Sequence, residues 1–332
     1  MNHGDDDRIA SDPLGELIHA AGRRSPPPRE DYERVLAASR VAWQNKVRSR
    51  KRRRWYALAA SLAIISGTAG VLLALQPIAP VPVAAIVVAD GNIALFSDDS
   101  GTWEPLAEAG TEFFAGSRLR AGAAGRVALA MSGGGSLRIN ASTEVLLGER
   151  GVVDLVSGML YFDSHSREGA DAIEIVTPLG VVRDIGTQFE VRSTPSSLRV
   201  RVRTGEVEFR SPLAAEFQSS AGREFELSAN GALQLGEIAP DDDDWAWTAA
   251  LAVAPATERG SVLGYLQWIA RESGKPLQFD SPNTELGAQF VSWNADTRGL
   301  TPLQVLDSIA ATSDFSYELR DDGAILIRRR EQ

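Results

Sequence analysis

The chain has 332 residues, a formal net charge of −10 and no cysteine. Its length suits about two or three domains, and its hydrophobic content of 44% excludes wholesale disorder. The lack of cysteine excludes disulfides, dithiol redox chemistry and thiolate metal sites. The charge is uneven, because residues 1–54 hold 13 basic and 8 acidic side chains, whereas residues 76–332 hold 21 basic and 36 acidic ones.

Residues 1–54 are predicted to form two short helices, at 13–21 and 29–46, separated by a proline-rich break. Apolar side chains of the second helix recur at i, i+3, i+4 and i+7, which predicts one apolar face. A helix this small cannot bury such a face by itself. Two interpretations stay open: a docking helix for a cytoplasmic partner, or a juxtamembrane helix whose basic end binds anionic lipid. The docking interpretation assigns partner contacts to Tyr32, Leu36 and Trp43.

Residues 55–75 are predicted to be a transmembrane helix. These 21 residues include no charged side chain, and at about 1.5 Å per residue they would span about 30 Å, the thickness of a bilayer core. Six basic residues at 48–54 precede the run, so the N-terminus is expected in the cytoplasm. A cleaved signal peptide is disfavoured, because its apolar core would be shorter and would follow a shorter basic stretch. We therefore expect a single-pass protein of a bacterial inner membrane, with its later domains in the periplasm.

A linker rich in proline and alanine is predicted at residues 76–85. Residues 86–240 then show short alternating stretches broken by Gly, Ser, Asn and Asp, which is typical of β-strands. A weak repeat of glycine followed by alternating apolar residues begins at positions 91, 135, 158, 205 and 231. It predicts a mainly β domain built as an antiparallel hairpin or solenoid-like roll.

One hairpin of this domain can be written out in detail. A two-residue turn at Thr204 and Gly205 would pair residues 200–203 with residues 206–209, with apolar side chains on one face and opposite charges on the other. The alternating arginines would then lie on a solvated face of the sheet: Arg199, Arg201 and Arg203.

The acidic run at residues 241–244 opens a predicted solvated linker that extends to residue 256. Residues 257–330 are predicted to form a small α+β domain, with helices at 257–272 and from Thr301 to Ser313. Its predicted strands lie at 277–279, 289–292, 317–319 and 324–327.

No catalytic or metal-binding pattern stands out. The three histidines, His3, His19 and His165, lie far apart, and the sequence lacks a nucleophile elbow, a phosphate loop and zinc-ligand spacing. We expect no enzyme, no cofactor, no metal and no direct binding of nucleic acid.

Three motifs follow one another in residues 177–209: TP-x-G, G-T-x-F-x-V and V-x-V-x-x-G-x-V. In combination they resemble the core of the FecR family, the transmembrane regulators of iron-uptake sigma factors. The resemblance covers roughly residues 86–238. The motif residues are Thr177, Pro178, Gly180, Gly186, Thr187, Phe189, Val200, Val202, Gly205 and Val207.

Residues 257–330 are similar to the STN domain, a short module of secretins and TonB-dependent transducers. The similarity rests on the Val262-Leu-x-Tyr-Leu stretch, on the Thr-Pro opening of the second helix and on the closing strands. It implies contact with the signalling domain of a TonB-dependent outer-membrane receptor. The residues assigned to that contact are Leu303, Leu306 and Tyr317.

Together these resemblances imply a signal transducer that regulates an extracytoplasmic-function sigma factor through its cytoplasmic segment. Release of that segment could involve an intramembrane protease. The cytoplasmic segment is shorter than is usual in the family. The alternative is a membrane-anchored periplasmic scaffold or envelope-binding module without a sigma-factor partner.

The resemblance also draws attention to the bond between Gly186 and Thr187. Some FecR-like regulators cut themselves at such a bond, through attack of the threonine hydroxyl on the preceding carbonyl carbon. The competing interpretation is that Gly186 permits a tight bend and Thr187 fills a strand. No residue of the sequence identifies itself as the proton acceptor that self-cleavage requires.

Overall fold

The computed structural model describes residues 13–22, 28–41, 43, 80–106, 109–164, 172–255 and 260–330. Within these ranges no helix is both long enough and apolar enough to cross a membrane. The predicted transmembrane helix at residues 55–75 lies outside the described residues, as do the basic run before it and His165. The chain divides into two compact units, residues 1–79 and residues 80–332.

The first unit contains two helical stretches. Helix α1 (Pro13–Ala20) carries three apolar side chains that are all exposed. A second stretch is helical over residues 29–41. Its predicted boundary at residue 46 lies outside the described residues.

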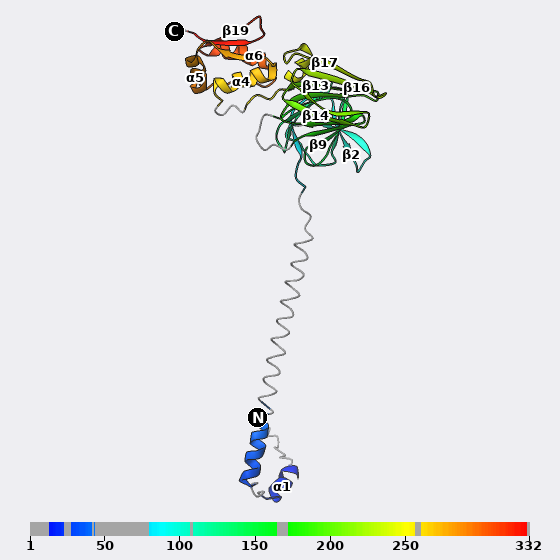
Figure 1. The fold of residues 1–332 in the computed structure, drawn as a ribbon. Helices are drawn as coiled ribbons and strands as arrows, with labels where there is room; N and C mark the ends of the chain where they lie inside the picture. The colour runs from blue at the N-terminus through cyan, green and yellow to red at the C-terminus, as the bar shows by residue number, and fades with distance from the viewer. Residues whose placement is uncertain are drawn as a thin grey trace, which may run out of the picture. The chain divides into compact units, whose positions relative to one another are not determined.

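The second unit begins with a curled, mainly antiparallel β structure of 17 strands (Figure 1). Its strands form two layers, which we call sheets A and B. Sheet A contains β1 (Ala84–Asp90), β4 (Glu112–Phe113), β6 (Arg126–Met131), β7 (Ser136–Ile139), β12 (Gln188–Ser193), β13 (Ser197–Thr204), β16 (Arg223–Ser228) and β17 (Leu233–Glu237). Sheet B contains β2 (Ile93–Ser97), β3 (Thr102–Leu106), β5 (Arg118–Ala121), β8 (Thr143–Leu147), β10 (Glu174–Thr177), β11 (Gly180–Asp184), β14 (Glu206–Ser211) and β15 (Ala214–Ser220).

The long strand β9 (Val152–Asp163) joins the two sheets. Its first half pairs with β8 and β10 in sheet B, and its second half pairs with β7 and β12 in sheet A. The strand bends at Gly158, whose φ is +108°. A Cβ atom at this position would lie 2.5 Å from the Cα atom of Thr143, so the crossing requires glycine.

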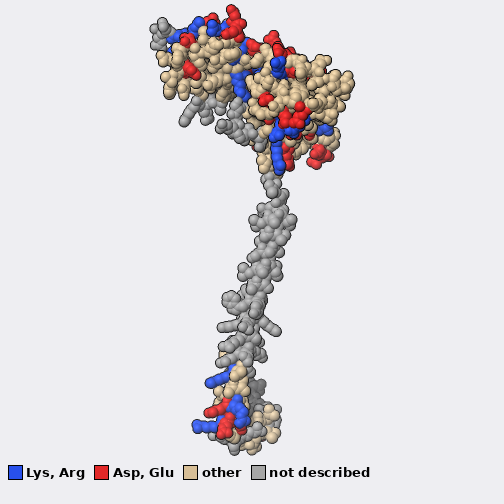
Figure 2. All heavy atoms as spheres, in the orientation of Figure 1, with Lys and Arg blue, Asp and Glu red and all other residues tan. Residues whose placement is uncertain are grey.

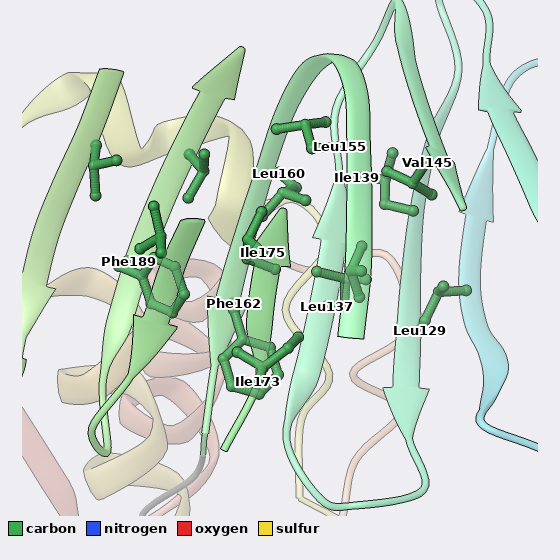
Figure 3. Close-up of a cluster of buried hydrophobic side chains, with 14 of the residues drawn as sticks. Leu129, Leu137, Ile139, Val145, Leu155, Leu160, Phe162, Ile173, Ile175 and Phe189 are labelled. Carbon is green, nitrogen blue, oxygen red and sulfur yellow. The ribbon is translucent and has the colours of Figure 1, made fainter. Parts of the chain in front are cut away.

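One cluster of apolar side chains fills the space between the sheets. Figure 3 shows its centre, where side chains from β7, β9 and β12 converge. Phe162 of β9 and Phe189 of β12 meet edge to face there, with ring centroids 6.1 Å apart. Inward-facing apolar residues alternate along the strands as the sequence predicts, and the mainly β fold is confirmed.

The predicted hairpin at Thr204 and Gly205 is wrong. Strand β13 pairs with β12 and β16 in sheet A, whereas β14 pairs with β11 and β15 in sheet B. Gly205, with φ +76°, carries the chain from one sheet to the other. Apolar and polar residues alternate both before and after Gly205. This pattern fits a crossing between sheets as well as a hairpin, because both place the apolar side chains inward.

The acidic segment after β17 is ordered, contrary to the prediction of a solvated linker. It forms a 3₁₀ turn (Asp243–Trp245) and the short helix α3 (Ala246–Ala249). Trp245 is buried, and its indole Nε1 donates a hydrogen bond of 2.8 Å to the carbonyl of Ala239. Asp244 accepts a hydrogen bond from Arg201 of β13, so this segment is attached to sheet A. We call residues 239–251 the connecting segment.

The C-terminal module contains helices packed against a three-stranded sheet of order β18-β20-β19 (Figure 1). The predicted helix stop at Gly274 and the predicted cap at Thr301 are both present. The predicted strand at 289–292 is wrong, because Ser281 caps a helix there and the chain stays helical to residue 290. The elements are α4 (Val262–Ser273), β18 (Leu277–Phe279), α5 (Pro282–Phe290), α6 (Pro302–Thr312), β19 (Phe315–Leu319) and β20 (Ile325–Arg329).

Candidate functional site

The sequence motifs that suggested a function divide into core residues and turn residues. Four of the motif side chains are buried in the core between the sheets: Phe189, Val200, Val202 and Val207. The Thr-Pro-x-Gly motif closes the turn between β10 and β11, where Thr177 Oγ1 donates a 2.7 Å hydrogen bond to the carbonyl of Gly180. These residues build the fold and leave one motif pair, Gly186 and Thr187, at an exposed corner.

The corner lies between β11 and β12. Gly186 is exposed and has a φ of +86°, a left-handed conformation that favours glycine. Thr187 is buried beside it. Gly205 packs against this bond so closely that a Cβ atom on it would lie 2.4 Å from the Gly186 carbonyl oxygen. Gly186 and Gly205, which belong to different motifs and are 19 residues apart in the sequence, therefore meet at one peptide bond.

Asp184 is the polar group that faces Thr187. Its carboxylate accepts a hydrogen bond from Thr187 Oγ1 and is also hydrogen bonded to the backbone N–H groups of Gly186 and Thr187. Burial raises the pKa of Asp184 above its ordinary value, and these hydrogen bonds offset only part of that effect. The proton acceptor that the sequence did not reveal thus lies three residues before Thr187.

A chain of side chains leads from this corner to the C-terminal module. The carbonyl of Thr187 accepts a 3.1 Å hydrogen bond from the backbone N–H of Ser164. The next residue, Gln188, donates a 3.0 Å hydrogen bond from Nε2 to Asp163. Asp163 is fully buried and also forms an ion pair with Arg271 of α4. The corner and α4 are therefore connected through Asp163.

The outward face of sheet A carries a row of polar side chains. Strand register places five residues side by side across β7, β9, β12, β13 and β16. Such a row normally faces water, yet the connecting segment and α4 cover it, and only Glu224 is more than 9% exposed. The row consists of Arg138, Tyr161, Glu190, Arg201 and Glu224.

The buried arginines correct the prediction of a solvated arginine face. Arg201 contacts both Glu224 and Asp244, at 2.8 and 2.6 Å. Arg203 is 2% exposed, and its Nε donates a 2.6 Å hydrogen bond to the carbonyl of Pro240. Its guanidinium also lies 5.4 Å from the ring of Trp245. The face is polar because it binds another part of the same chain.

The FecR protein family matches residues 117–208, the part of the chain that contains the corner and most of the polar row. Residues 117–208 therefore form a FecR segment of this chain. Two crystal structures of a "putative anti-sigma factor" from Parabacteroides distasonis are similar to it, with 17% and 18% identity and TM-scores of 0.35 and 0.34. Each match covers 64% of this chain and 99% of the other. A likeness this distant supports no inference about function. No curated protein matches the chain.

The residues predicted to contact a sigma factor lie on helical stretches of the first unit. Tyr32 and Trp43 are exposed by 60% and 68%, whereas Leu36 is half-buried. Val41 is also exposed. It lies on the side of the helix opposite Tyr32, because the nine residues between them make about two and a half turns.

The receptor-binding residues predicted for the C-terminal module do not share one surface. Leu303 is exposed, and Tyr317 is half-buried with its hydroxyl hydrogen bonded to Asp307. Leu306 is 1% exposed and belongs to the module's core. Helical spacing placed it on the inward face with Ile309, so Leu306 stabilises the module and cannot contact a partner.

Among the described residues, no group of three or more His, Asp or Glu side chains is arranged to hold a metal ion. Figure 2 shows acidic and basic side chains interspersed over the visible surface of residues 80–330. Among the described residues, buried charged side chains lie at the corner and along the polar row.

Proposed function

We propose that this protein, which contains a FecR segment, regulates a sigma factor of the extracytoplasmic-function class through its N-terminal helices. The observation that carries the proposal is a pair of short helical stretches with exposed apolar side chains. On α1, Leu14, Leu17 and Ile18 are each about 70% exposed and recur at i, i+3 and i+4. An apolar stripe of this kind is suited to a groove on a partner protein.

The proposal includes the topology expected from the sequence. Residues 55–75 would anchor the chain in a bacterial inner membrane, with the N-terminal helices in the cytoplasm and residues 80–332 in the periplasm. The C-terminal module, which resembles an STN domain, would contact the signalling domain of a TonB-dependent receptor. Leu303 and Tyr317 supply part of that surface, and an intramembrane protease would release the cytoplasmic segment.

The second helical stretch allows a test with two matched substitutions. Val35 and Val41 are 65% and 58% exposed. Val35 lies near Tyr32 on the predicted docking face, whereas Val41 lies on the side of the helix opposite Tyr32. The full chain, in the membrane fraction of cells that express each candidate sigma factor, is captured through a C-terminal tag. Val35→Ala is expected to weaken sigma-factor recovery, whereas Val41→Ala, the same chemical change, is expected to leave it unchanged.

Equal recovery with both valine variants would contradict a docking role for this face. Recovery of no sigma factor by the wild-type chain would favour the alternative of a membrane-anchored periplasmic scaffold.

A second activity, self-cleavage between Gly186 and Thr187, is favoured by the position of Asp184. In this proposal Thr187 Oγ1 attacks the carbonyl carbon of Gly186 and passes its proton to Asp184. The C–N bond then breaks, and the nitrogen of Thr187 takes up the proton, which leaves an ester between the two residues. Water hydrolyses the ester to two chains. Asp184 contacts both the hydroxyl and the N–H of Thr187, so it can accept the proton and return it.

The full chain with tags at both ends tests this step by intact mass. Fragments that end at residue 186 and begin at residue 187 are expected, and Thr187→Val is expected to abolish them. Thr187→Ser should retain cleavage, and Asp184→Asn should slow it by about 100-fold or more. Asp90→Asn makes the same chemical change at the exposed last residue of β1 and serves as the control. Intact wild-type chain at all times would contradict the proposal.

A further inference from the structure

The contact between α4 and sheet A rests on two adjacent residues of α4. Glu272 receives two hydrogen bonds from the guanidinium of Arg138, with N–O distances of 2.7 and 2.6 Å. Both side chains are 1% exposed, and Arg138 Nη1 also donates to the carbonyl of Thr248 in the connecting segment. Arg138 and Glu272 are 134 residues apart in the sequence, and together they form a paired charge in the interior.

The neighbouring residue forms a second ion pair of opposite polarity. Arg271 contacts the buried carboxylate of Asp163 through Nε and Nη2. In the first pair the cation, Arg138, belongs to the β domain. In the second pair the cation, Arg271, belongs to α4. A reversed placement of these two residues would put Arg271 against Arg138 and Glu272 against Asp163, so the crossed arrangement favours one docked orientation.

The largest apolar residues of α4 pack into the core of the C-terminal module. Tyr265, Leu266 and Ile269 belong to the core of the C-terminal module, which is a separate cluster from the core between sheets A and B. Separation of the module would therefore expose charged groups, which water solvates well, and would leave both apolar cores closed. The contact can open without unfolding either part.

Loss of only one pair would be unfavourable. A buried charge that loses its partner while it stays buried costs several times more than a pair that becomes fully hydrated. Because Arg271 and Glu272 are adjacent on one helix, the two pairs form and separate together. The geometry points to a contact with two states, docked and released.

We propose that Arg271 and Glu272 of α4 form a crossed ionic latch that docks the C-terminal module on the outward face of sheet A and lets it release as a folded unit. Because Asp163 also binds Gln188, next to Thr187, release of the latch changes the surroundings of the Gly186–Thr187 corner. The latch does not depend on sigma-factor binding or on self-cleavage. A partner that binds the module better when released would shift the equilibrium by its difference in affinity for the two states.

Pairs of spin labels measure the docked and released states directly. The chain has no cysteine, so Leu235→Cys on β17 and Phe290→Cys on α5, both about 75% exposed, accept labels at two defined sites. In the full chain, double electron–electron resonance is expected to give one narrow distance distribution. Glu272→Gln keeps the shape but removes the charge, and it is expected to add a broad, longer-distance population.

The expected change in the ratio of released to docked molecules is about 100-fold for Glu272→Gln. Exchange of the charges, Arg138→Glu with Glu272→Arg, is expected to recover the narrow distribution at least in part. The double substitution Arg138→Met with Glu272→Met replaces the pair by apolar side chains of similar size and is expected to stay docked. Glu144→Gln removes a carboxylate from an ion-pair group on sheet B and serves as the control.

Near-ultraviolet circular dichroism reports whether the module stays folded, through the packed rings of Tyr265 and Trp293. A released population with an unchanged spectrum supports the latch. A wild-type distance distribution in Glu272→Gln would overturn it. Loss of the aromatic signal in that variant would also overturn it, because the module would then depend on the contact for its fold.

Discussion

The two faces of sheet A are both buried, but different groups cover them. The inward face packs apolar side chains against sheet B, and Phe162 and Phe189 lie at its centre (Figure 3). The outward face carries charged and aromatic side chains that the connecting segment and α4 cover. Neighbouring residues of one strand, Tyr161 and Phe162, are therefore equally inaccessible for different physical reasons. Alternation of polar and apolar residues identifies the core of the β domain, but it does not distinguish a solvated face from an interface.

Removal of the aromatic ring at the inward face should have the largest effect. Phe189→Ala leaves a cavity in a close-packed core, and we expect a loss of about 4 kcal/mol in the free energy of unfolding. Urea denaturation of the full chain measures it. Leu235→Ala, at an exposed position on β17, should change the free energy by less than about 0.5 kcal/mol. Similar losses for both variants would contradict the assignment of the core.

A single substitution on the outward face should have an effect nearly as large, but on the free energy of docking of the C-terminal module. Arg138→Met removes the partner of the Glu272 carboxylate in the docked state, and we expect a loss of about 3 kcal/mol in the free energy of docking, measured from the released fraction by electron–electron resonance. Addition of Glu272→Met should recover most of it, because no charge then stays unpaired. Additive losses in this double-mutant cycle would show that the two residues do not interact.

Removal of the Trp43 ring in the first unit should weaken binding of the proposed sigma factor and should leave the stability of the second unit unchanged. Trp43→Ala is expected to reduce sigma-factor affinity by about 2 kcal/mol, or roughly 30-fold. The unfolding midpoint of the second unit should not change. Titration by fluorescence anisotropy measures the affinity, and an unaltered dissociation constant would remove Trp43 from the interface.

The pH dependence of self-cleavage should follow the protonation of Asp184. Because its pKa lies above the ordinary value, the carboxylate is protonated at a higher pH than an exposed aspartate. Cleavage should therefore slow as the pH falls through that raised pKa and should reach a plateau above it. The same shift gives a contribution to folding stability that is present at low pH and is lost as the pH rises through the pKa. A cleavage rate independent of pH would exclude Asp184 as the proton acceptor.

The smallest effect is expected at the partly exposed ion-pair group on sheet B, in which the Glu144 side chain is 11% exposed and the two arginines are about half exposed. Burial raises the pKa of Glu144, but hydrogen bonds from Arg120 and Arg118 outweigh it, so the pKa lies below its ordinary value. The stabilisation is present above the unfolded-state pKa and is lost as the pH falls through the lower, folded-state value. Glu144→Gln should lower the free energy of unfolding by less than about 1 kcal/mol at pH 7, and by less as the pH falls through the lowered pKa. A loss that does not change as the pH falls would show that charge is not its cause.

Much of this fold could be predicted from residues that obey local rules. Gly274 and Thr301 ended and began helices where the sequence indicated, and the motif residues of the FecR segment fell into strands and turns. The crossing at Gly205 could not be predicted, because period-two alternation contains no information about which sheet a strand joins. The strand expected at residues 289–292 failed because the caps at Ser281 and Pro282 outweighed a short apolar run.

The candidate site was only half visible in the sequence. Gly186 and Thr187 are adjacent and form part of a motif, whereas Asp184 lies outside the motif and could have been found only by a search for a carboxylate within one turn of Thr187. The partners of the latch are separated by more than 100 residues, and single-sequence patterns do not report such pairs. Four successive aspartates suggested solvent, but Asp241 and Asp244 bind Lys275 and Arg201.

Hydroxyl-radical footprinting of the full chain tests most directly the central claim that the chain covers its own polar face. Tyr161 is on the outward face and Phe162 is on the inward face, and Tyr32, which is 60% exposed, serves as an internal standard. We predict that Tyr161 is oxidised at least about tenfold more slowly than Tyr32, and is as well protected as Phe162. Oxidation of Tyr161 at the rate of Tyr32 would contradict the account.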